Sequence, residues 1–251
     1  MIEVIHHDAV AEVHLARPPV NALNLELLQT LHAALDKAVA DGARGIVLSG
    51  VPGMFSAGVD VPALLQADRA GVQAFWREFF ATASVLACSP VPVAAAVTGH
   101  SPAGGAVMAL MCDYRVMAQG PYKIGLNEVQ VGLAVPDCIQ LALRRVVGAY
   151  RAERLLVAGE MIDAEQALAC GFVDETTGID QVVTRALHWM NGLLALPPHA
   201  MLATRRVARA DLIATYADLD TLPIDEFVEG FYHPQTQATL QALAARLKSK
   251  G

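Results

Sequence analysis

This sequence of 251 residues has few charged residues and no long basic cluster. Charged side chains make up 17% of it and hydrophobic ones 54%, and the formal net charge is -7. A chain this rich in hydrophobic residues can bury a large core and is not expected to be disordered. An acidic balance without basic clusters argues against a nucleic-acid-binding surface. We therefore expect one large domain, or one domain with a small helical appendage.

The sequence also lacks paired cysteines and the common metal-binding motifs. Its four cysteines, Cys88, Cys112, Cys138 and Cys170, are far apart and form no CxxC motif. Such cysteines are typical of free thiols in a reducing compartment, so we predict a cytoplasmic protein. The eight histidines show no HExxH or similar spacing, and we predict neither a metal nor a separate cofactor.

No secretory or membrane-spanning segment is expected. The first ten residues already contain Glu3 and Asp8, which a signal peptide would not. Residues 79–112 contain no charged side chain, but proline and glycine divide this run at Pro90, Pro92, Gly99, Pro102, Gly104 and Gly105. No piece approaches the roughly 20 apolar residues that a membrane span requires. A strand, a turn and a helix in a buried core explain the run better.

Hydrophobic periodicity predicts strands that alternate with helices, followed by a mostly helical C-terminal part. Strands are expected over residues 2–6, 10–16, 44–50, 91–97, 114–118 and 172–174. Helices are expected over residues 25–40, 61–65, 71–87, 106–111, 137–147, 150–158, 163–169, 179–196, 200–214, 225–232 and 234–248. Strand, helix and next strand form a right-handed crossover, which indicates an α/β fold with parallel strands. We place the α/β core in residues 1–196 and a C-terminal helical region in residues 197–251.

Two glycine-rich turns each follow a predicted strand and lead into a helix. The first is GMFSAGVD at residues 53–60 and the second is GHSPAGG at residues 99–105. A helix N-terminus has unpaired N–H groups, and glycine lets a substrate approach them closely. Two such turns at adjacent strand ends could each direct one N–H group at a single oxygen atom. Ser101 is not expected to be a nucleophile, because Ala103 replaces the last glycine of a GxSxG motif.

Glu128 is an isolated acid between Leu126 and Val129. An acid in apolar surroundings has a raised pKa, which suits proton transfer. The alternative is a structural role, in which Glu128 forms a buried ion pair with Lys123 or with an arginine.

Taken together, several motifs in order resemble the crotonase (enoyl-CoA hydratase/isomerase) superfamily. They are ARPPVNALN, GMFSAGVD, GHSPAGGAVMALMCDYRVMA, IGLNEVQVGLAVP and AERLLVAGEMIDAEQALACGFVDE, and they extend over nearly the whole chain. Within the superfamily, they are most similar to the Δ3,Δ2-enoyl-CoA isomerases of fatty-acid β-oxidation. The resemblance implies the crotonase fold, with a repeated ββα core and a C-terminal helical region that forms trimers or dimers of trimers.

The resemblance also implies roles for individual residues. The family's two oxyanion-hole N–H groups fall on Val59 and Gly104, and its proton-transfer glutamate falls on Glu128. Hydratases carry a second glutamate at the position of Val107. Contacts to coenzyme A, which is part of the substrate, are expected at the following residues: Val20, Ala22, Ser56, Ala57 and Asp60, together with Arg246 or Lys248 reaching a neighbouring subunit's substrate.

Three functions remain open from the sequence. The first is an isomerase that uses Glu128 alone to move a proton from C2 to C4 of a 3-enoyl-CoA. The second is a hydratase or other lyase of the same superfamily, which would need a further carboxylate at Val107 or nearby, for example Asp137. The third is a non-catalytic protein that binds acyl-CoA, against which the two glycine turns and Glu128 argue.

Overall fold

The computed structural model describes residues 1–249, and the side chains of all of these except Lys248. Within that range a six-stranded sheet has the order β1-β2-β3-β5-β7-β10. Its strands are β1 (Ile2–His7), β2 (Val10–Leu15), β3 (Gly45–Ser49), β5 (Val93–Val97), β7 (Tyr114–Ala118) and β10 (Glu175–Thr177). β1 and β2 pair antiparallel, and the other neighbours pair parallel. The predicted crossover is present, because β2 and β3 are parallel and α1 (Leu25–Ala40) connects them.

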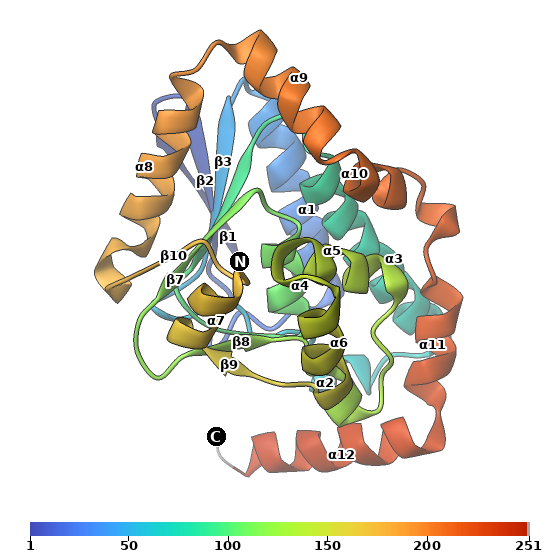
Figure 1. The fold of residues 1–251 in the computed structure, drawn as a ribbon. Coiled ribbons are helices and arrows are strands. Elements are labelled where there is room, and N and C mark those ends of the chain that lie inside the picture. Colours follow the sequence, from blue (N-terminus) through green and yellow to red (C-terminus); the bar gives the residue numbers. More distant parts are fainter. Residues whose placement is uncertain (250–251) are drawn as a thin grey trace.

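Helices cover both faces of this sheet, as Figure 1 shows. Alternate residues of the central strands point to opposite faces, as strand geometry requires. Val47, Ala94 and Val116 pack with α8 (Val182–Leu194). Residues such as Ile46 and Ala95 belong to the larger core on the other face, with α1, α3 (Arg69–Cys88) and α4 (Gly104–Leu110).

A second sheet supports the two glycine-rich turns. It has four strands in the order β4-β6-β8-β9. Their bounds are β4 (Gly53–Met54), β6 (Gly99–Pro102), β8 (Lys123–Gly125) and β9 (Ile162–Asp163). Part of each predicted turn is therefore a short strand, and β4 pairs directly with β6. This pairing brings the two turns together.

The remaining described elements are helical and lie mainly in the second half of the chain. They are α2 (Val61–Leu64), η1 (Glu128–Val131), α5 (Asp137–Val147), α6 (Ala149–Ala158), α7 (Ala164–Cys170), η2 (Ile179–Gln181), α9 (Pro198–Ala208), α10 (Ala210–Tyr216), η3 (Leu219–Thr221), α11 (Ile224–Tyr232) and α12 (Pro234–Lys248). None of the helices in the described part is long and apolar enough to cross a membrane.

Two predicted elements differ from the structure. The helix predicted over residues 200–214 is two helices, α9 and α10, which meet at Arg209. Its guanidinium is buried, donates to the carbonyl of Met111 and pairs with Asp113, so the chain bends to bring it inward. The strand predicted at residues 172–174 lies at Glu175–Thr177 instead. Phe172 and Val173 are buried because they pack in the hydrophobic core, and they do not belong to the strand.

Candidate active site

The two glycine-rich turns touch at Gly58, and only a glycine fits there. Gly58 has a φ of +75°. A Cβ atom built on it would lie 3.0 Å from the Pro102 carbonyl oxygen and 3.4 Å from the Gly104 nitrogen. A side chain at this position would therefore separate the turns. The turn after β3 and the turn after β5 form one continuous backbone surface.

The N–H groups of Val59 and Gly104 lie in this surface. The N–H group of Leu23 donates to the Gly58 carbonyl, and the Leu23 carbonyl accepts from the Asp60 N–H group. The Val59 N–H group between them takes part in neither hydrogen bond. Gly104 is the first residue of α4, where an N–H group has no acceptor within the helix. Nowhere in residues 1–249 does either N–H group have a hydrogen-bond acceptor.

Glu128 is buried in an apolar environment without a cationic partner. Only 8% of the residue is exposed, and its Oε2 atom has no hydrogen-bond partner in the described chain. Burial raises the pKa of Glu128 to about 7, since a charged carboxylate is disfavoured away from water. Among the described residues no ion pair includes Glu128, and Lys123 is exposed. The structural alternative, a buried ion pair with Lys123 or with an arginine, is therefore wrong.

A backbone hydrogen bond connects the Glu128 segment to the glycine turns. The N–H of Ala103 donates to the carbonyl of Gly125 over 2.8 Å. Glu128 follows Gly125 by three residues, so its backbone lies within about 11 Å of that carbonyl. All three predicted catalytic positions, Val59, Gly104 and Glu128, thus belong to segments in direct contact.

No second carboxylate stands at the helix position where hydratases carry one. Val107 lies on α4, fully buried within the apolar core. Asp137, the alternative acid, is exposed at the start of α5 and pairs with Arg144. Neither position therefore supplies a second buried carboxylate.

The residues predicted to bind coenzyme A mostly come together. Ala57 donates its N–H to the Val20 carbonyl over 3.0 Å, and the Ser56 hydroxyl donates to the Asn21 carbonyl over 2.8 Å. Both hydrogen bonds join the loop that follows β2 to the turn that follows β3. Because the Ser56 hydroxyl and N–H group are both used within the protein, only the backbone carbonyl at this position remains for a ligand.

Arg17 is a candidate that the sequence reasoning missed. It donates to the carbonyl of Ala22 and pairs with Asp60, each over 2.8 Å. Its side chain is 23% exposed, so it places a positive charge at the edge of the loop beside Ala22. The sequence signal for this role was a basic residue directly before the segment PPVN at residues 18–21.

The two C-terminal basic residues lie apart from this cluster in the sequence. Arg246 is exposed on α12. The side chain of Lys248 lies outside the described residues. Helix α12 itself contacts α2, which follows Asp60, and η1, which begins with Glu128.

The GxSxG alternative has no support in the geometry. Ser101 is fully buried, and its hydroxyl has no hydrogen-bond partner within the described chain. His100 accepts a hydrogen bond from the Lys123 N–H and is not engaged with Ser101. This arrangement provides no activated serine.

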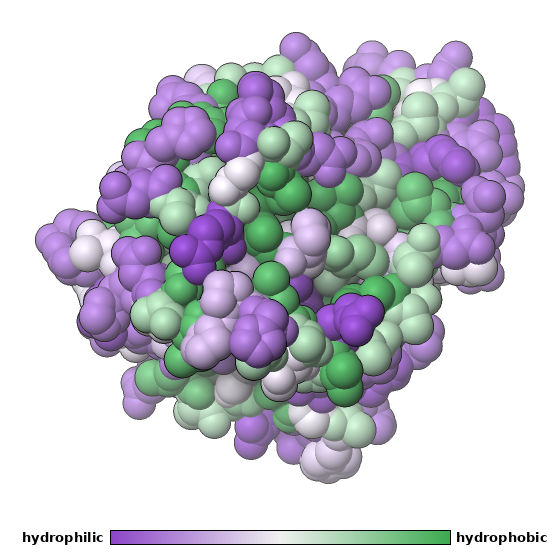
Figure 2. Space-filling model, turned by 90° about the horizontal axis from the view of Figure 1, so that it is seen from above, coloured by the Kyte–Doolittle hydropathy of each residue, from purple (hydrophilic) through white to green (hydrophobic). Residues whose placement is uncertain are grey.

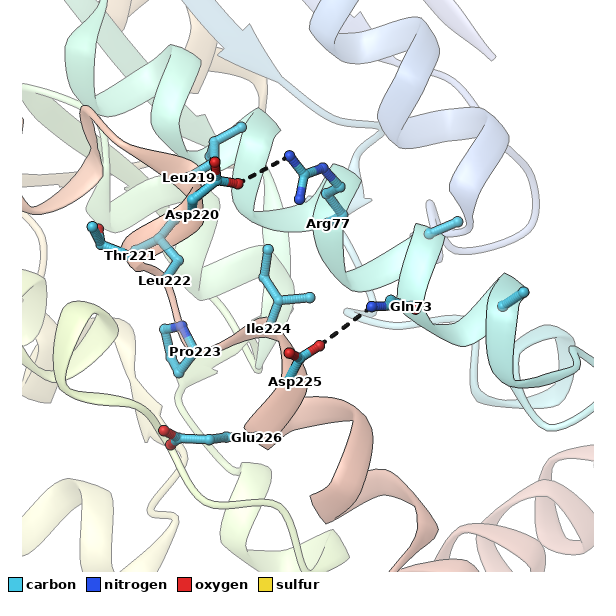
Figure 3. Close-up of a pocket in the computed structure, with 12 residues that line it drawn as sticks. Gln73, Arg77, Leu219, Asp220, Thr221, Leu222, Pro223, Ile224, Asp225 and Glu226 are labelled. Carbon is cyan, nitrogen blue, oxygen red and sulfur yellow. Dashed lines mark hydrogen bonds and ion pairs between the residues drawn. The ribbon is translucent and has the colours of Figure 1, made fainter.

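A surface pocket of about 640 Å³ lies elsewhere, between α3 and residues 219–226. Figure 3 shows Arg77 directed at Asp220 and Gln73 directed at Asp225, over 3.2 Å and 3.3 Å. These polar contacts connect the core to the C-terminal helices. The residues that line the pocket include none of the predicted site residues, so we do not assign the reaction to it.

Comparisons with known proteins identify relatives that extend over most of this chain. The family model described as enoyl-CoA hydratase/isomerase matches residues 6–250. The human protein named enoyl-CoA delta isomerase 1, mitochondrial, is 35% identical over 247 residues, which cover 96% of this chain and 81% of the relative. A probable enoyl-CoA hydratase of Mycobacterium avium is 35% identical over 198 residues, which cover 78% and 76% of the two chains. The crystal structure of human mitochondrial Δ3-Δ2-enoyl-CoA isomerase superposes with a TM-score of 0.93 at 33% identity and covers 99% of this chain and 98% of its own.

Proposed function

This chain belongs to the enoyl-CoA hydratase/isomerase family, and on that premise we propose that it is an enoyl-CoA isomerase. The reaction moves the double bond of a 3-enoyl-CoA into conjugation with the thioester, giving a trans-2-enoyl-CoA. The human relative of similar sequence and the human structure of similar fold both carry isomerase names. We place the reaction in fatty-acid β-oxidation.

The observation that carries the proposal is a single buried carboxylate, Glu128, with no second carboxylate at Val107. Glu128 has a pKa raised to about 7, which allows it both to accept and to return a proton near neutral pH. Val107 supplies no base to activate water. A dry site also protects a reactive intermediate from proton exchange with solvent. One carboxylate suffices for isomerisation, whereas efficient hydration in this family uses two.

The mechanism follows from where charge develops. The Glu128 carboxylate removes a proton from C2, and the electron pair moves onto the thioester oxygen. The N–H groups of Val59 and Gly104 stabilise that oxygen, and one such donor typically contributes ~10²–10³ in rate. Glu128 then returns the proton to C4 as the electrons move back. The proton stays on one face of a short allylic segment, so no second acid is required.

Coenzyme A enters this proposal as part of the substrate. Val20, Ala22, Ser56, Ala57 and Asp60 form the segment that we assign to its adenine and pantetheine parts, mainly through backbone atoms. Within residues 1–249 no group of three histidine, cysteine or acidic side chains is arranged to hold a metal ion. The proposed chemistry uses the protein's own residues and the thioester alone.

We also propose that the protein assembles as a homotrimer through residues 197–251. Helix α9 supports this, because none of its 11 residues is buried in the single chain. Val207 on α9 is 72% exposed. Figure 2 looks onto the side where α9 lies in Figure 1 and shows hydrophobic residues between hydrophilic ones. Arg246 or Lys248 of one subunit would then reach the substrate phosphates of its neighbour.

The cytoplasmic location stays a prediction, as the human relative is named mitochondrial.

The test is a side-by-side assay of the purified protein with 3-enoyl-CoA and 2-enoyl-CoA. We expect isomerisation to exceed hydration by orders of magnitude. Hydration at an equal or greater rate would replace the isomerase proposal with the hydratase one. Tight binding of both compounds with turnover of neither would identify a non-catalytic acyl-CoA-binding protein.

A further inference from the structure

Ala103 has a backbone conformation that normally requires glycine. Its φ is 45° and its ψ is -117°, which is the region of the first central residue of a type II′ turn. A residue with a Cβ atom is strained there. Glycine, which would remove the strain, occupies the next two positions, Gly104 and Gly105. The backbone strain therefore falls on Ala103, whose side chain is a methyl group, and not on either glycine.

The methyl group of Ala103, which belongs to the second turn, lies close to Gly58 in the first turn. A Cβ atom built on Gly58 would lie 3.3 Å from the Ala103 Cβ. The Ala103 N–H is held by the Gly125 carbonyl on the other side. Ala103 thus contacts the first turn through its side chain and the Glu128 segment through its backbone.

The ψ angle of Ala103 sets the direction of the Gly104 N–H. This N–H group lies in the peptide plane that follows Ala103, and rotation about ψ turns that plane. Removing the methyl group widens the range of accessible φ and ψ angles. It also removes a methyl group that lies next to Gly58.

We propose that Ala103 is a positioning residue, whose strained backbone and methyl group fix the Gly104 N–H relative to the Val59 turn. This inference rests on the proposed function, since it assumes that Gly104 stabilises the thioester oxygen. Ala103 itself is not proposed to contact the reacting atoms.

The experiment compares Ala103→Gly, Ala103→Ser and Ala109→Gly by steady-state kinetics and thermal melting. Ala103→Gly releases strain, so its melting temperature should rise by about 2–4 °C. Its kcat should nevertheless fall at least about 10-fold with KM little changed, because a loosened donor acts mainly in the transition state. Ala103→Ser keeps a Cβ atom and should retain kcat within about 3-fold. Ala109→Gly makes the same change further along α4 and should lower the melting temperature without lowering kcat.

Three results would overturn the inference. They are an unchanged kcat in Ala103→Gly, a kcat that falls together with the melting temperature, and an Ala103→Ser variant as slow as Ala103→Gly. The faster of the two wild-type reactions, isomerisation or hydration, serves as the kinetic measure, since both need the thioester oxygen stabilised. A wild type that hydrates rather than isomerises therefore contradicts the isomerase proposal and leaves this comparison intact, whereas a wild type that turns over neither compound overturns both.

Discussion

At the scale of single residues, Glu128 combines two properties that a structural acid would not need. It is buried, and the described chain offers no cation to pair with it. A buried carboxylate without a partner destabilises its own charged form. The Glu128 side chain therefore costs stability, which is accounted for if the same burial tunes its pKa for proton transfer.

Replacing Glu128 by glutamine should abolish the reaction while preserving the fold. The amide side chain in a Glu128→Gln variant cannot accept the C2 proton, so kcat should fall by roughly 10²–10⁴-fold. KM for 3-enoyl-CoA should stay close to that of the wild type, since coenzyme A contacts lie on other segments. Glu165→Gln, which changes an exposed acid on α7, is the matched control and should keep full activity. Near-normal turnover in Glu128→Gln would show that another group moves the proton.

The pH dependence of the rate should report the same carboxyl group. Only the ionised form of Glu128 can remove the C2 proton, so kcat/KM should be low at acidic pH and rise through an apparent pKa of about 7. A series of initial-rate measurements from mildly acidic to mildly alkaline pH checks this. A profile that is flat across this range, or that rises only near the ordinary glutamate value of 4.5, would contradict the assignment of Glu128 as the base.

The stability of the protein should also depend on Glu128 in this pH range. The folded pKa of about 7 lies above the ordinary 4.5, so the folded state holds a proton that the unfolded state releases. Stability is then lost as pH rises from about 4.5 to 7, by roughly 3 kcal/mol at about 1.4 kcal/mol for each pH unit. Glu128→Gln should therefore be more stable than the wild type above the folded pKa and about equally stable at the ordinary one. Urea unfolding of both proteins at the two pH values measures the difference, and a less stable variant at the higher pH would contradict it.

At the scale of secondary-structure elements, the proposed site depends on two turns that meet at Gly58, where a side chain would be crowded. β3 and β5 are parallel neighbours, so the chain leaves both strands at the same edge of the sheet. β4 and β6 then hold the two exits together. Gly58 and Gly104 form the contact, and this closeness positions the Val59 and Gly104 N–H groups in one surface.

Gly58→Ala should damage activity much more than Gly53→Ala. Both glycines have positive φ angles, +75° and +88°, so an alanine introduces similar backbone strain at each. At Gly58 the new Cβ atom would press on Pro102, Ala103 and Gly104, whereas at Gly53 the nearest atom is 3.9 Å away on Tyr122. We expect kcat to fall ~10²–10³-fold in Gly58→Ala, the usual effect of losing one oxyanion donor. Equal rates in the two variants, measured below their melting temperatures, would show that the contact between the turns does not matter.

The sequence predicts these elements well where the local pattern alone decides them. The alternation in Val10–Leu15 and the apolar run in Gly45–Ser49 predict β2 and β3, because each buries a regular set of side chains. The break between α9 and α10 could not be read in this way. Every residue near Arg209 tolerates a helix, and the bend comes from distant partners, Asp113 and Met111.

The residues of the candidate site could be predicted from the family's sequence motifs, but not from the local pattern of hydrophobic and polar residues. The positions of Val59, Gly104 and Glu128 follow from the resemblance to the family, and the structure places their segments in contact. The strain at Ala103 had no signal in the sequence, because an alanine beside two glycines gives no sign of its own φ angle. The role of Arg17 was hidden for a similar reason, since its partner Asp60 is 43 residues away.

At the scale of the whole molecule, the C-terminal helices both cover the core and present an unused surface. Arg205 on α9 pairs with Asp113 through two charge-assisted hydrogen bonds, of 2.8 Å and 2.9 Å. This anchors α9 by polar contacts, while its residue Val207 stays 72% exposed. A helix held in this way in a single chain has an apolar surface that a second copy could bury.

Val207→Glu should therefore separate the subunits. Val207 lies on α9 at 72% exposure, and Val157 on α6 is a matched control at 77% exposure. A charge at Val207 would be buried without a partner in the proposed trimer, which is strongly unfavourable, so we expect light scattering to detect monomers. Val157→Glu should leave the trimer intact. Because Val59, Gly104 and Glu128 all come from one chain, monomers should keep kcat, while KM rises if Arg246 or Lys248 of a neighbour binds the substrate phosphates. A wild-type protein that is already monomeric would contradict the proposed trimer. A Val207→Glu variant that remains a trimer would place the subunit contact away from α9.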